Sequence, residues 1–377
     1  MHPEEDFLGT QLWYLRFCGV IRKDTAFHTF RRRCVFGTVF LFIILQMIFV
    51  GLHVKEFAKI CDAIPTLIIS AFSFSKCHAF VFHSRDLFAL SDAFKVLQQH
   101  TTAKDEALFE RNNRFHAKLT HMYMVLALIV GCFYVASSIV QEISLSRVEG
   151  HVVFVTPMAF PHNYQHPVVY VVSFLFSCDA MLMGIFINGS VDASFSELAT
   201  SVRIHFGLIQ DRFRSLDFTV ADAETHLKAT VEYHEDVLGQ CRVLTGRYQY
   251  VVFSLLLLDS VLLCVIGYQF VIFMNTPRVI MLVAMAFVMI LQAVIYCYHG
   301  STIYDESLSV ADAIYQSNWY EARPAVQRRV RLCMTRAQQP VVTKGGFMKA
   351  TLPMLKKMLS STGSYITMLL SFEAEEP

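Results

Sequence analysis

The sequence predicts an all-α membrane protein with seven transmembrane helices, and three observations support this prediction. The chain of 377 residues is 54% hydrophobic and only 17% charged, whereas a soluble domain is about 45–50% apolar and roughly 25% charged. Its mean hydropathy is +0.44. Seven stretches are long and apolar enough to cross about 30 Å of hydrocarbon as helices, namely 34–54, 60–81, 121–141, 168–188, 250–273, 279–299 and 352–372.

Composition and motifs exclude several other classes of protein. The net charge of +1 leaves no basic excess for nucleic acid, and ten cysteines in a chain of this length do not indicate a disulfide scaffold. The sequence contains no phosphate-binding glycine loop, no Cys-x-x-Cys and no acid-flanked pair of helical histidines. We therefore expect neither an enzyme nor a metal or cofactor site. Without a recognisable signal peptide, the first spanning helix is expected to direct the chain to the membrane.

The basic residues of the connections predict the orientation of the chain. The N-terminal segment and the second, fourth and sixth connections carry six Lys and Arg each, whereas the opposite side carries four in total. Because basic loops stay in the cytoplasm, the N-terminus should be cytoplasmic and the C-terminus extracellular. This orientation is the inverse of a rhodopsin-type G-protein-coupled receptor, and no acid-Arg-aromatic triplet closes the third helix.

The helices divide the chain into seven segments. These are a cytoplasmic N-terminal segment (1–33), transmembrane helices one to four (34–188), a cytoplasmic hairpin (189–249), transmembrane helices five and six (250–299), a cytoplasmic connection with the first part of helix seven (300–346), the spanning part of helix seven (347–372) and an extracellular tail (373–377). The hairpin is too long for a plain loop, and apolar residues recur in it at helical steps of three and four. Its apolar stripe fits self-packing of the hairpin or burial against other subunits.

Four ionisable residues lie within the predicted spans, where such residues are functional candidates. Asp62 and Lys76 lie near opposite ends of the second span, and the simplest interpretation is that both reach the headgroups. Asp179 and Asp259 lie about half way along their spans, and we expect both to face the bundle interior in a hydrogen-bonded structural role. A proton-coupled transporter is a minor alternative, since no paired base accompanies these acids.

Motifs near the C-terminus resemble those of insect odorant receptors. The closing run 363–372, GSYITMLLSF, is similar to the family's Ser/Thr-Tyr pair followed by apolar residues. Residues 336–340, RAQQP, resemble its basic-Ala-Gln-x-Pro element, and residues 296–300, YCYHG, resemble its Tyr-Cys-x-x-Gly. Further matches that suggest a cytoplasmic subunit anchor are His234, Tyr315 and Trp319.

The resemblance implies a tuning subunit of an odorant-gated cation channel in the plasma membrane of a sensory neuron dendrite. Such a subunit assembles with the odorant-receptor co-receptor in a heterotetramer, and the spanning part of helix seven lines the pore. The pore and gate candidates on one face of that helix are Ser361, Ser364, Tyr365, Met368 and Phe372. Lys356 and Lys357 lie beside this path, where a basic pair raises the barrier to cation entry. A gustatory-type receptor shares the terminal tyrosine motif and is the main alternative; a G-protein-coupled receptor and a transporter are less favoured.

The resemblance also implies a ligand pocket in the outer half of the bundle for a small volatile molecule, and the serines and tyrosines nearby suggest an aromatic one. Helical spacing selects the candidate lining residues, namely Phe72, Gly131, Tyr134, Val135, Ser138, Tyr170, Phe174, Ser177, Cys178, Met181, Tyr268 and Met285. Each of these side chains could instead pack against a neighbouring helix.

Overall fold

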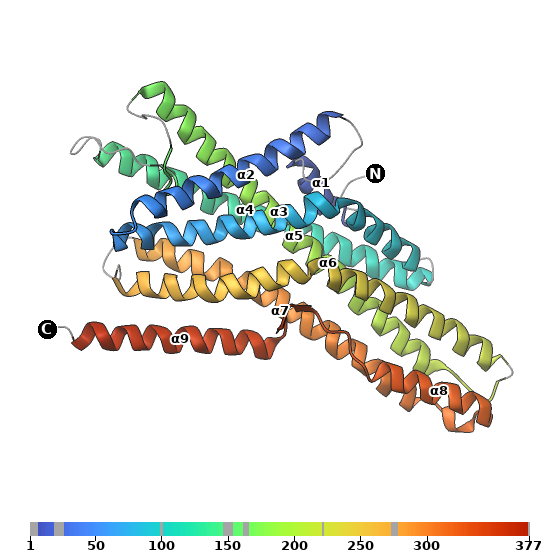
Figure 1. Cartoon of the computed structure of the whole chain (residues 1–377). Helices are drawn as coiled ribbons and strands as arrows, with labels where there is room; N and C mark the ends of the chain where they lie inside the picture. Colours follow the sequence, from blue (N-terminus) through green and yellow to red (C-terminus); the bar gives the residue numbers. More distant parts are fainter. Residues whose placement is uncertain are drawn as a thin grey trace.

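Five helices in the computed structural model are much longer than a bilayer crossing requires. The structure describes residues 7–18, 26–98, 101–145, 154–160, 166–220, 222–272 and 278–375. The five long helices are α3 (Phe57–Gln98), α4 (Ala103–Leu145), α5 (Pro167–Ser215), α6 (Ala223–Ile272) and α7 (Arg278–Gln316). About 20 residues suffice to cross hydrocarbon, so these helices form a long bundle in which α5, α6 and α7 continue beyond the others (Figure 1).

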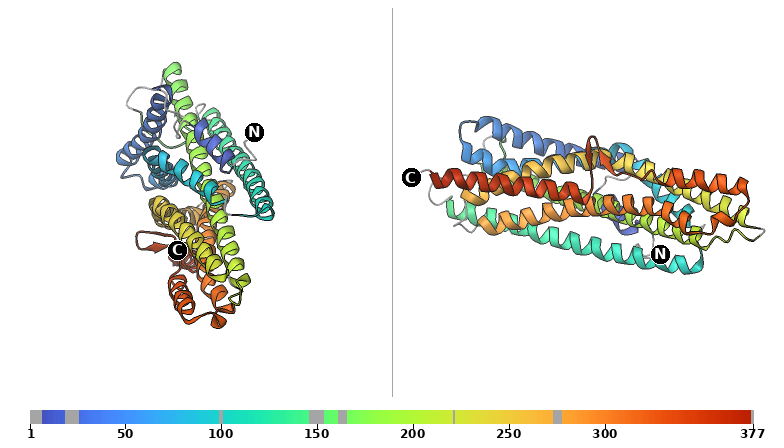
Figure 2. Two further views of the ribbon diagram at one scale, coloured as in Figure 1. Left: turned by 90° about the vertical axis from the view of Figure 1, so that its right-hand side faces the viewer. Right: turned by 90° about the horizontal axis from the view of Figure 1, so that it is seen from below.

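Shorter elements complete the bundle. They are α1 (Gly9–Phe17), α2 (Ala26–Leu52), the 3₁₀ turn η1 (Trp319–Glu321), α8 (Pro324–Ala337), the strands β1 (Lys344–Gly345) and β2 (Met348–Lys349), and α9 (Leu352–Glu375). The two strands pair antiparallel through a turn that contains Gly346, whose φ of 55° suits glycine. In Figure 2, α9 runs alongside the bundle and ends at the C-terminus, at the end opposite to α8.

The apolar stripe of α5 is buried within the chain itself. Val191, Phe195, Leu198, Val202 and Phe206 are all fully buried, and they belong to one continuous core that also includes residues of α6, α7 and α8. α5 ends at Ser215 and α6 begins at Ala223. The stripe is therefore accounted for by packing within one chain.

Among the described residues, six helices are long and apolar enough to cross a membrane: α2, α3, α4, α5, α6 and α7. The helix expected to be the seventh span, α9, has 24 residues, which is sufficient for a crossing. Its composition is more polar because it contains Lys356, Lys357 and a run of serine and threonine. Such a composition fits a helix with one face in contact with water.

A close backbone contact sets the start of α9. Gly300 of α7 lies directly under the carbonyl of Ala350, where any β-carbon would collide with the carbonyl oxygen. The next residue, Ser301, accepts a hydrogen bond through Oγ from the backbone N–H of Leu352 at 2.9 Å. This accounts for the glycine of the 296–300 motif, because only glycine allows α7 and the backbone before α9 to approach so closely.

We expect Gly300→Ala to destabilise the protein by about 1–3 kcal/mol, the usual penalty of overpacking. The added methyl group must push Ala350 away from α7 and so displace the start of α9. Thermal unfolding of the detergent-solubilised protein measures this loss. Gly207→Ala is the matched control, because Gly207 is a helical glycine of α5 with nothing within 4 Å of a new β-carbon. Equal unfolding temperatures for both variants would contradict the role of Gly300.

Candidate functional site

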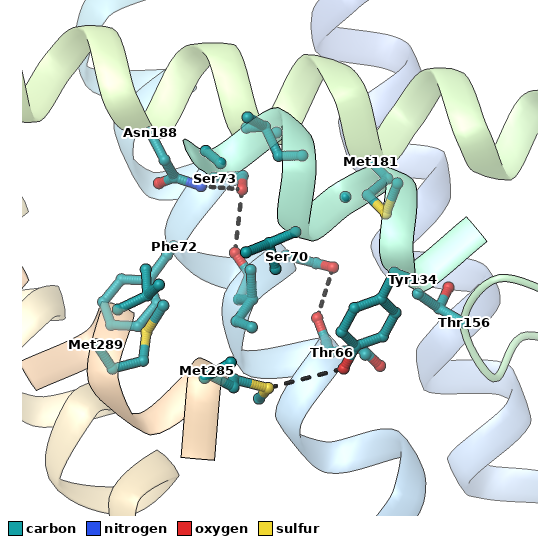
Figure 3. A pocket seen from close by; sticks show the side chains of 18 of the residues that line it. Thr66, Ser70, Phe72, Ser73, Tyr134, Thr156, Met181, Asn188, Met285 and Met289 are labelled. Atoms are coloured by element: carbon teal, nitrogen blue, oxygen red, sulfur yellow. Dashed lines mark hydrogen bonds between the residues drawn. The ribbon is translucent and has the colours of Figure 1, made fainter. Parts of the chain in front are cut away.

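A cavity of about 400 Å³ lies between α2, α3, α4, α5 and α7, and the side chains in Figure 3 point into it. Its volume falls in the range of sites that bind small molecules, about 300–1,000 Å³. Most of the wall is apolar, and it includes Phe72 and the methionines Met181, Met285 and Met289. Methionine side chains adapt to irregular shapes, so this wall can fit closely around ligands that differ in outline.

The cavity includes five of the lining residues expected from helical spacing. Those in its wall are Phe72, Gly131, Tyr134, Met181 and Met285. Seven others do not line it, namely Val135, Ser138, Tyr170, Phe174, Ser177, Cys178 and Tyr268. Of the α5 candidates, Met181 lies in the wall, which residues 180–188 of that helix form, whereas the four between 170 and 178 do not; α6 contributes none of the lining residues.

The residues outside the wall have other partners. The rings of Tyr170 and Phe174 contact each other with centroids 5.9 Å apart, and Tyr170 also contacts Phe154. The hydroxyls of Ser138 and Ser177 donate to backbone carbonyls of their own helices. The side chains of these four residues are therefore occupied by packing or by backbone hydrogen bonds.

Sequence reasoning missed the polar side of the cavity. Thr66, Ser70 and Ser73 of α3 line it, as do Asn188 of α5 and Gln292 of α7. The three hydroxyl residues recur at steps of four and three, which is the spacing of one helix face. The spacing of these three residues could have predicted a polar stripe from the sequence. The residues around Asn188 and Gln292 do not indicate that these two lie beside it.

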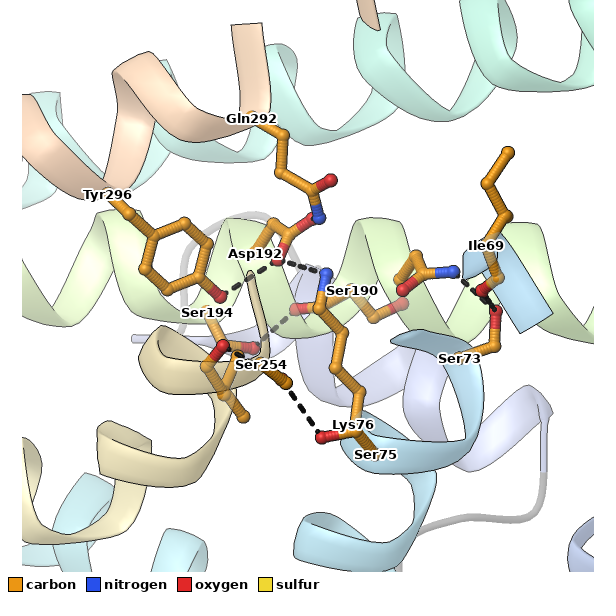
Figure 4. A network of polar contacts seen from close by, with 12 residues as sticks. Ile69, Ser73, Ser75, Lys76, Ser190, Asp192, Ser194, Ser254, Gln292 and Tyr296 are labelled. Carbon is orange, nitrogen blue, oxygen red and sulfur yellow. Dashed lines mark hydrogen bonds and ion pairs between the residues drawn. The ribbon is translucent and has the colours of Figure 1, made fainter. Parts of the chain in front are cut away.

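A buried polar network lies next to the cavity and shares Gln292 with it (Figure 4). The carboxylate of Asp192 accepts at Oδ1 from Lys76 Nζ at 2.6 Å and from the Tyr296 hydroxyl at 2.8 Å. Its Oδ2 accepts from Gln292 Nε2 at 2.7 Å. Both charged side chains are almost completely buried. The network thus links α3, α5 and α7 around one carboxylate.

The expectation that Lys76 reaches the headgroups is wrong. Its side chain points into the bundle because Asp192 provides a countercharge there, and an ammonium buried without one would be strongly destabilising. Asp259 faces the interior as expected, but neither of its carboxyl oxygens has a hydrogen-bond partner among the described residues. Asp179 is exposed on α5 rather than directed inward, since it lies on the outer face of that helix, whereas Ser177 and Ala180 are buried on its inner face.

The outer face of α9 carries the residues expected at the pore. Leu355, Met358 and Thr362 are buried against the bundle. The opposite face bears Ser361, Ser364, Tyr365 and Met368, which are all exposed in this chain; the side chain of Phe372 lies outside the described residues. This face is available to another helix or to water.

The three anchor candidates lie in different surroundings. His234 is only 4% exposed and its ring contacts Phe206 inside the α5–α6 hairpin, so its side chain packs within the hairpin of its own chain. Trp319 is partly buried against the core, whereas Tyr315 is 70% exposed. Near them, hydrogen bonds from Asn318 and Thr219 hold the pKa of the Asp217 carboxyl below its usual range. The bond from Asn318 joins the hairpin turn to the end of α7.

Comparisons with known proteins agree with this architecture. A family model described as 7tm Odorant receptor matches residues 56–363. Odorant receptor 82a of Drosophila melanogaster is 26% identical over 86% of this chain and 87% of its own, and odorant receptor 47a of the same species is 26% identical over 84% and 86%. The solved structure of the olfactory receptor OR5 from Machilis hrabei in complex with eugenol has a TM-score of 0.79 at 18% identity and covers 97% of both chains, so the fold is shared.

We expect Lys76→Met to destabilise the protein by about 3–5 kcal/mol, because it leaves the Asp192 carboxylate buried without its countercharge. Thermal unfolding in detergent measures the loss. Adding Asp192→Leu should restore much of the stability, since a buried ion pair replaced by apolar side chains is often tolerated.

The matched control for this prediction is Lys59→Met. Lys59 pairs with Glu56 at 2.8 Å on the surface, where both side chains are about half exposed, so its loss should change stability by at most about 1 kcal/mol. A loss in Lys76→Met as small as in this control would show that the buried pair does not contribute as argued.

Proposed function

The chain belongs to the 7tm odorant receptor family and is a multi-pass protein of the plasma membrane, and on this basis we propose that it is a tuning subunit of an odorant-gated cation channel. The subunit binds a small volatile ligand in the cavity between α2, α3, α4, α5 and α7, and it conducts cations together with the odorant-receptor co-receptor. The observation that carries the proposal is the cavity itself, with its size, its apolar wall and its few polar groups.

The composition of the wall suits an apolar odorant. Burial of apolar surface contributes roughly 25 cal/mol per Å², and micromolar affinity corresponds to about 8 kcal/mol. A small ligand that is largely enclosed therefore needs only one or two polar contacts. Flexible methionines on α5 and α7 can adjust to the ligand, while the aromatic rings of Phe72 and Tyr134 offer flat surfaces for it.

The exposed face of α9 supports its assignment to the pore. In a tetramer, four copies of this face would surround one axis, with serines towards the inner part and Met368 further out. Large apolar side chains at a narrow point can close a channel by excluding water. Lys356 and Lys357 are exposed near the start of α9, where their charge would influence cation entry from the cytoplasmic side in the predicted orientation.

The helix α7 offers a direct route from ligand to pore. It contributes residues 280–292 to the cavity, Gln292 and Tyr296 to the Asp192 network, and Gly300 and Ser301 to the start of α9. A ligand that binds the open arrangement of α7 more tightly than the closed one shifts the channel towards opening. The free energy of this shift equals the difference between the ligand's binding free energies for the open and the closed arrangement.

Whole-cell recording tests the proposal. The chain is expressed in a heterologous cell with and without the co-receptor, under an odorant panel and with G-protein cycling blocked. We expect a rapid cation current only when both chains are present, unaffected by the block. Silence of the pair, or a current that disappears when G proteins are blocked, would exclude a tuning subunit of a ligand-gated channel.

Tyr134 and Phe174 form a matched pair for locating the ligand. Tyr134 lines the cavity, whereas Phe174 packs against Tyr170 outside it. We expect Tyr134→Ala to change which odorants activate the assembled channel, by about tenfold or more in half-maximal concentration for ligands that touch the ring. Phe174→Ala should leave the order of potency unchanged. Both are measured as dose-response curves with surface expression as the control, and an unchanged profile for Tyr134→Ala would exclude this cavity.

A further inference from the structure

We infer that the cavity selects ligands that carry a hydroxyl group, an alcohol or a phenol, because the α3 side of its wall presents hydrogen-bond acceptors while tyrosine hydroxyls of α4 present donors. This inference rests on the proposed function, since it names the ligand class of the same cavity. It follows from the hydrogen atoms of the α3 hydroxyls, which already bond to backbone carbonyls.

The hydroxyl stripe of α3 has its donors occupied. Thr66 Oγ1 donates to the carbonyl of Ala63 at 2.9 Å, Ser70 Oγ to that of Thr66 at 2.7 Å, and Ser73 Oγ to that of Ile69 at 3.1 Å. A hydroxyl has one hydrogen and two lone pairs. Each of these groups can therefore offer the cavity only a lone pair while its backbone hydrogen bond is kept.

Each of the two amide side chains of the wall directs its NH₂ group towards a protein acceptor. Ser73 has used its hydrogen, so its oxygen can only accept, and Asn188 must direct Nδ2 towards it, at 2.6 Å. An ionised carboxylate also only accepts, so Gln292 must direct Nε2 towards Asp192, at 2.7 Å. In both residues the carbonyl oxygen points away from that partner (Figures 3 and 4). The Asn188 carbonyl oxygen is buried with no partner among the described residues.

Donors to a ligand come from α4, because Tyr123 and Tyr134 both line the cavity. The Tyr134 hydroxyl donates to the sulfur of Met285 at 3.8 Å, and a thioether is a weak acceptor that a ligand oxygen can replace. Thr156 Oγ1 accepts from Gln46, a bond that does not use its own hydrogen. A ligand hydroxyl can accept from Tyr134 and donate to the α3 lone pairs at the same time. An aldehyde, ketone or ester can only accept, and a hydrocarbon can do neither.

A protonated amine, although a donor, fits this cavity less well. The carboxylate next to the wall, Asp192, is already paired with Lys76 and has accepted two further hydrogen bonds. An ammonium in the cavity would lose its water and would have to compete with Lys76 for Asp192, which is unfavourable. A neutral hydroxyl avoids this penalty.

Binding of two matched ligand series to the purified chain assembled with the co-receptor tests the inference. One series is phenylethanol, phenylacetaldehyde and propylbenzene; the other is octanol, octanal and nonane. A net hydrogen bond contributes about 0.5–1.5 kcal/mol, so the alcohol of at least one series should bind about three- to tenfold more tightly than its aldehyde and hydrocarbon. Equal or weaker binding of both alcohols would overturn the inference.

Two variants test whether the hydroxyls of α3 cause the preference for the alcohol. The double variant Thr66→Val and Ser70→Ala removes two acceptors and should reduce the preference for the alcohol to about twofold or less. The control Thr245→Val removes an equivalent bond to the carbonyl of Cys241 on α6, away from the cavity, and should leave the preference intact. A preference that survives the double variant in a folded protein would overturn the role of the stripe.

The same measurement separates this inference from the proposed function. Alcohol-selective binding without any odorant-evoked current would leave the inference standing and exclude the channel proposal. Current and binding that are independent of the hydroxyl group would leave the channel proposal standing and exclude the inference. No binding of any member of either series would overturn both the ligand class and the cavity as the ligand site.

Discussion

The carboxylate of Asp192 is the constraint on which the rest of the bundle depends. It is buried, it pairs with Lys76, and it holds Gln292 and Tyr296 at hydrogen-bonding distance. Each partner must stay in place, because a charge left unpaired in this interior is strongly destabilising. Helices α3, α5 and α7 are therefore fixed relative to one another at this level, and Gln292 extends the network into the cavity wall.

The cavity and α9 are connected through α7. One side of this helix borders the cavity, and further along it Gly300 and Ser301 hold the segment at which α9 begins. A stiff helix can carry a displacement over this distance, because its own hydrogen bonds keep its residues in fixed register. The same arrangement explains why α9 needs only one buried face: its position is set by its start and by Leu355, Met358 and Thr362.

Several features of the site could be read from the sequence. Helical spacing on apolar stretches selected Phe72, Gly131, Tyr134, Met181 and Met285, which the structure brings together in one wall. On α5 it also selected four residues between 170 and 178, before the part of the helix that forms the wall, because periodicity identifies a face of a helix but not the position along it at which neighbouring helices leave space. The threonine and serine stripe of α3 was visible as a pattern, yet its role depends on the helices opposite to it.

The sequence by itself determined that the chain is a helical membrane protein with a receptor-like C-terminal signature, because hydrophobic length and short motifs are local properties. Only the tertiary structure decided the partner of Lys76, since Asp192 lies 116 residues away and no local pattern joins them. It also decided that Asp179 points outward while Asp259 points inward. A buried charge is stabilised by what folding brings beside it, and that depends on how helices pack rather than on the sequence around either residue.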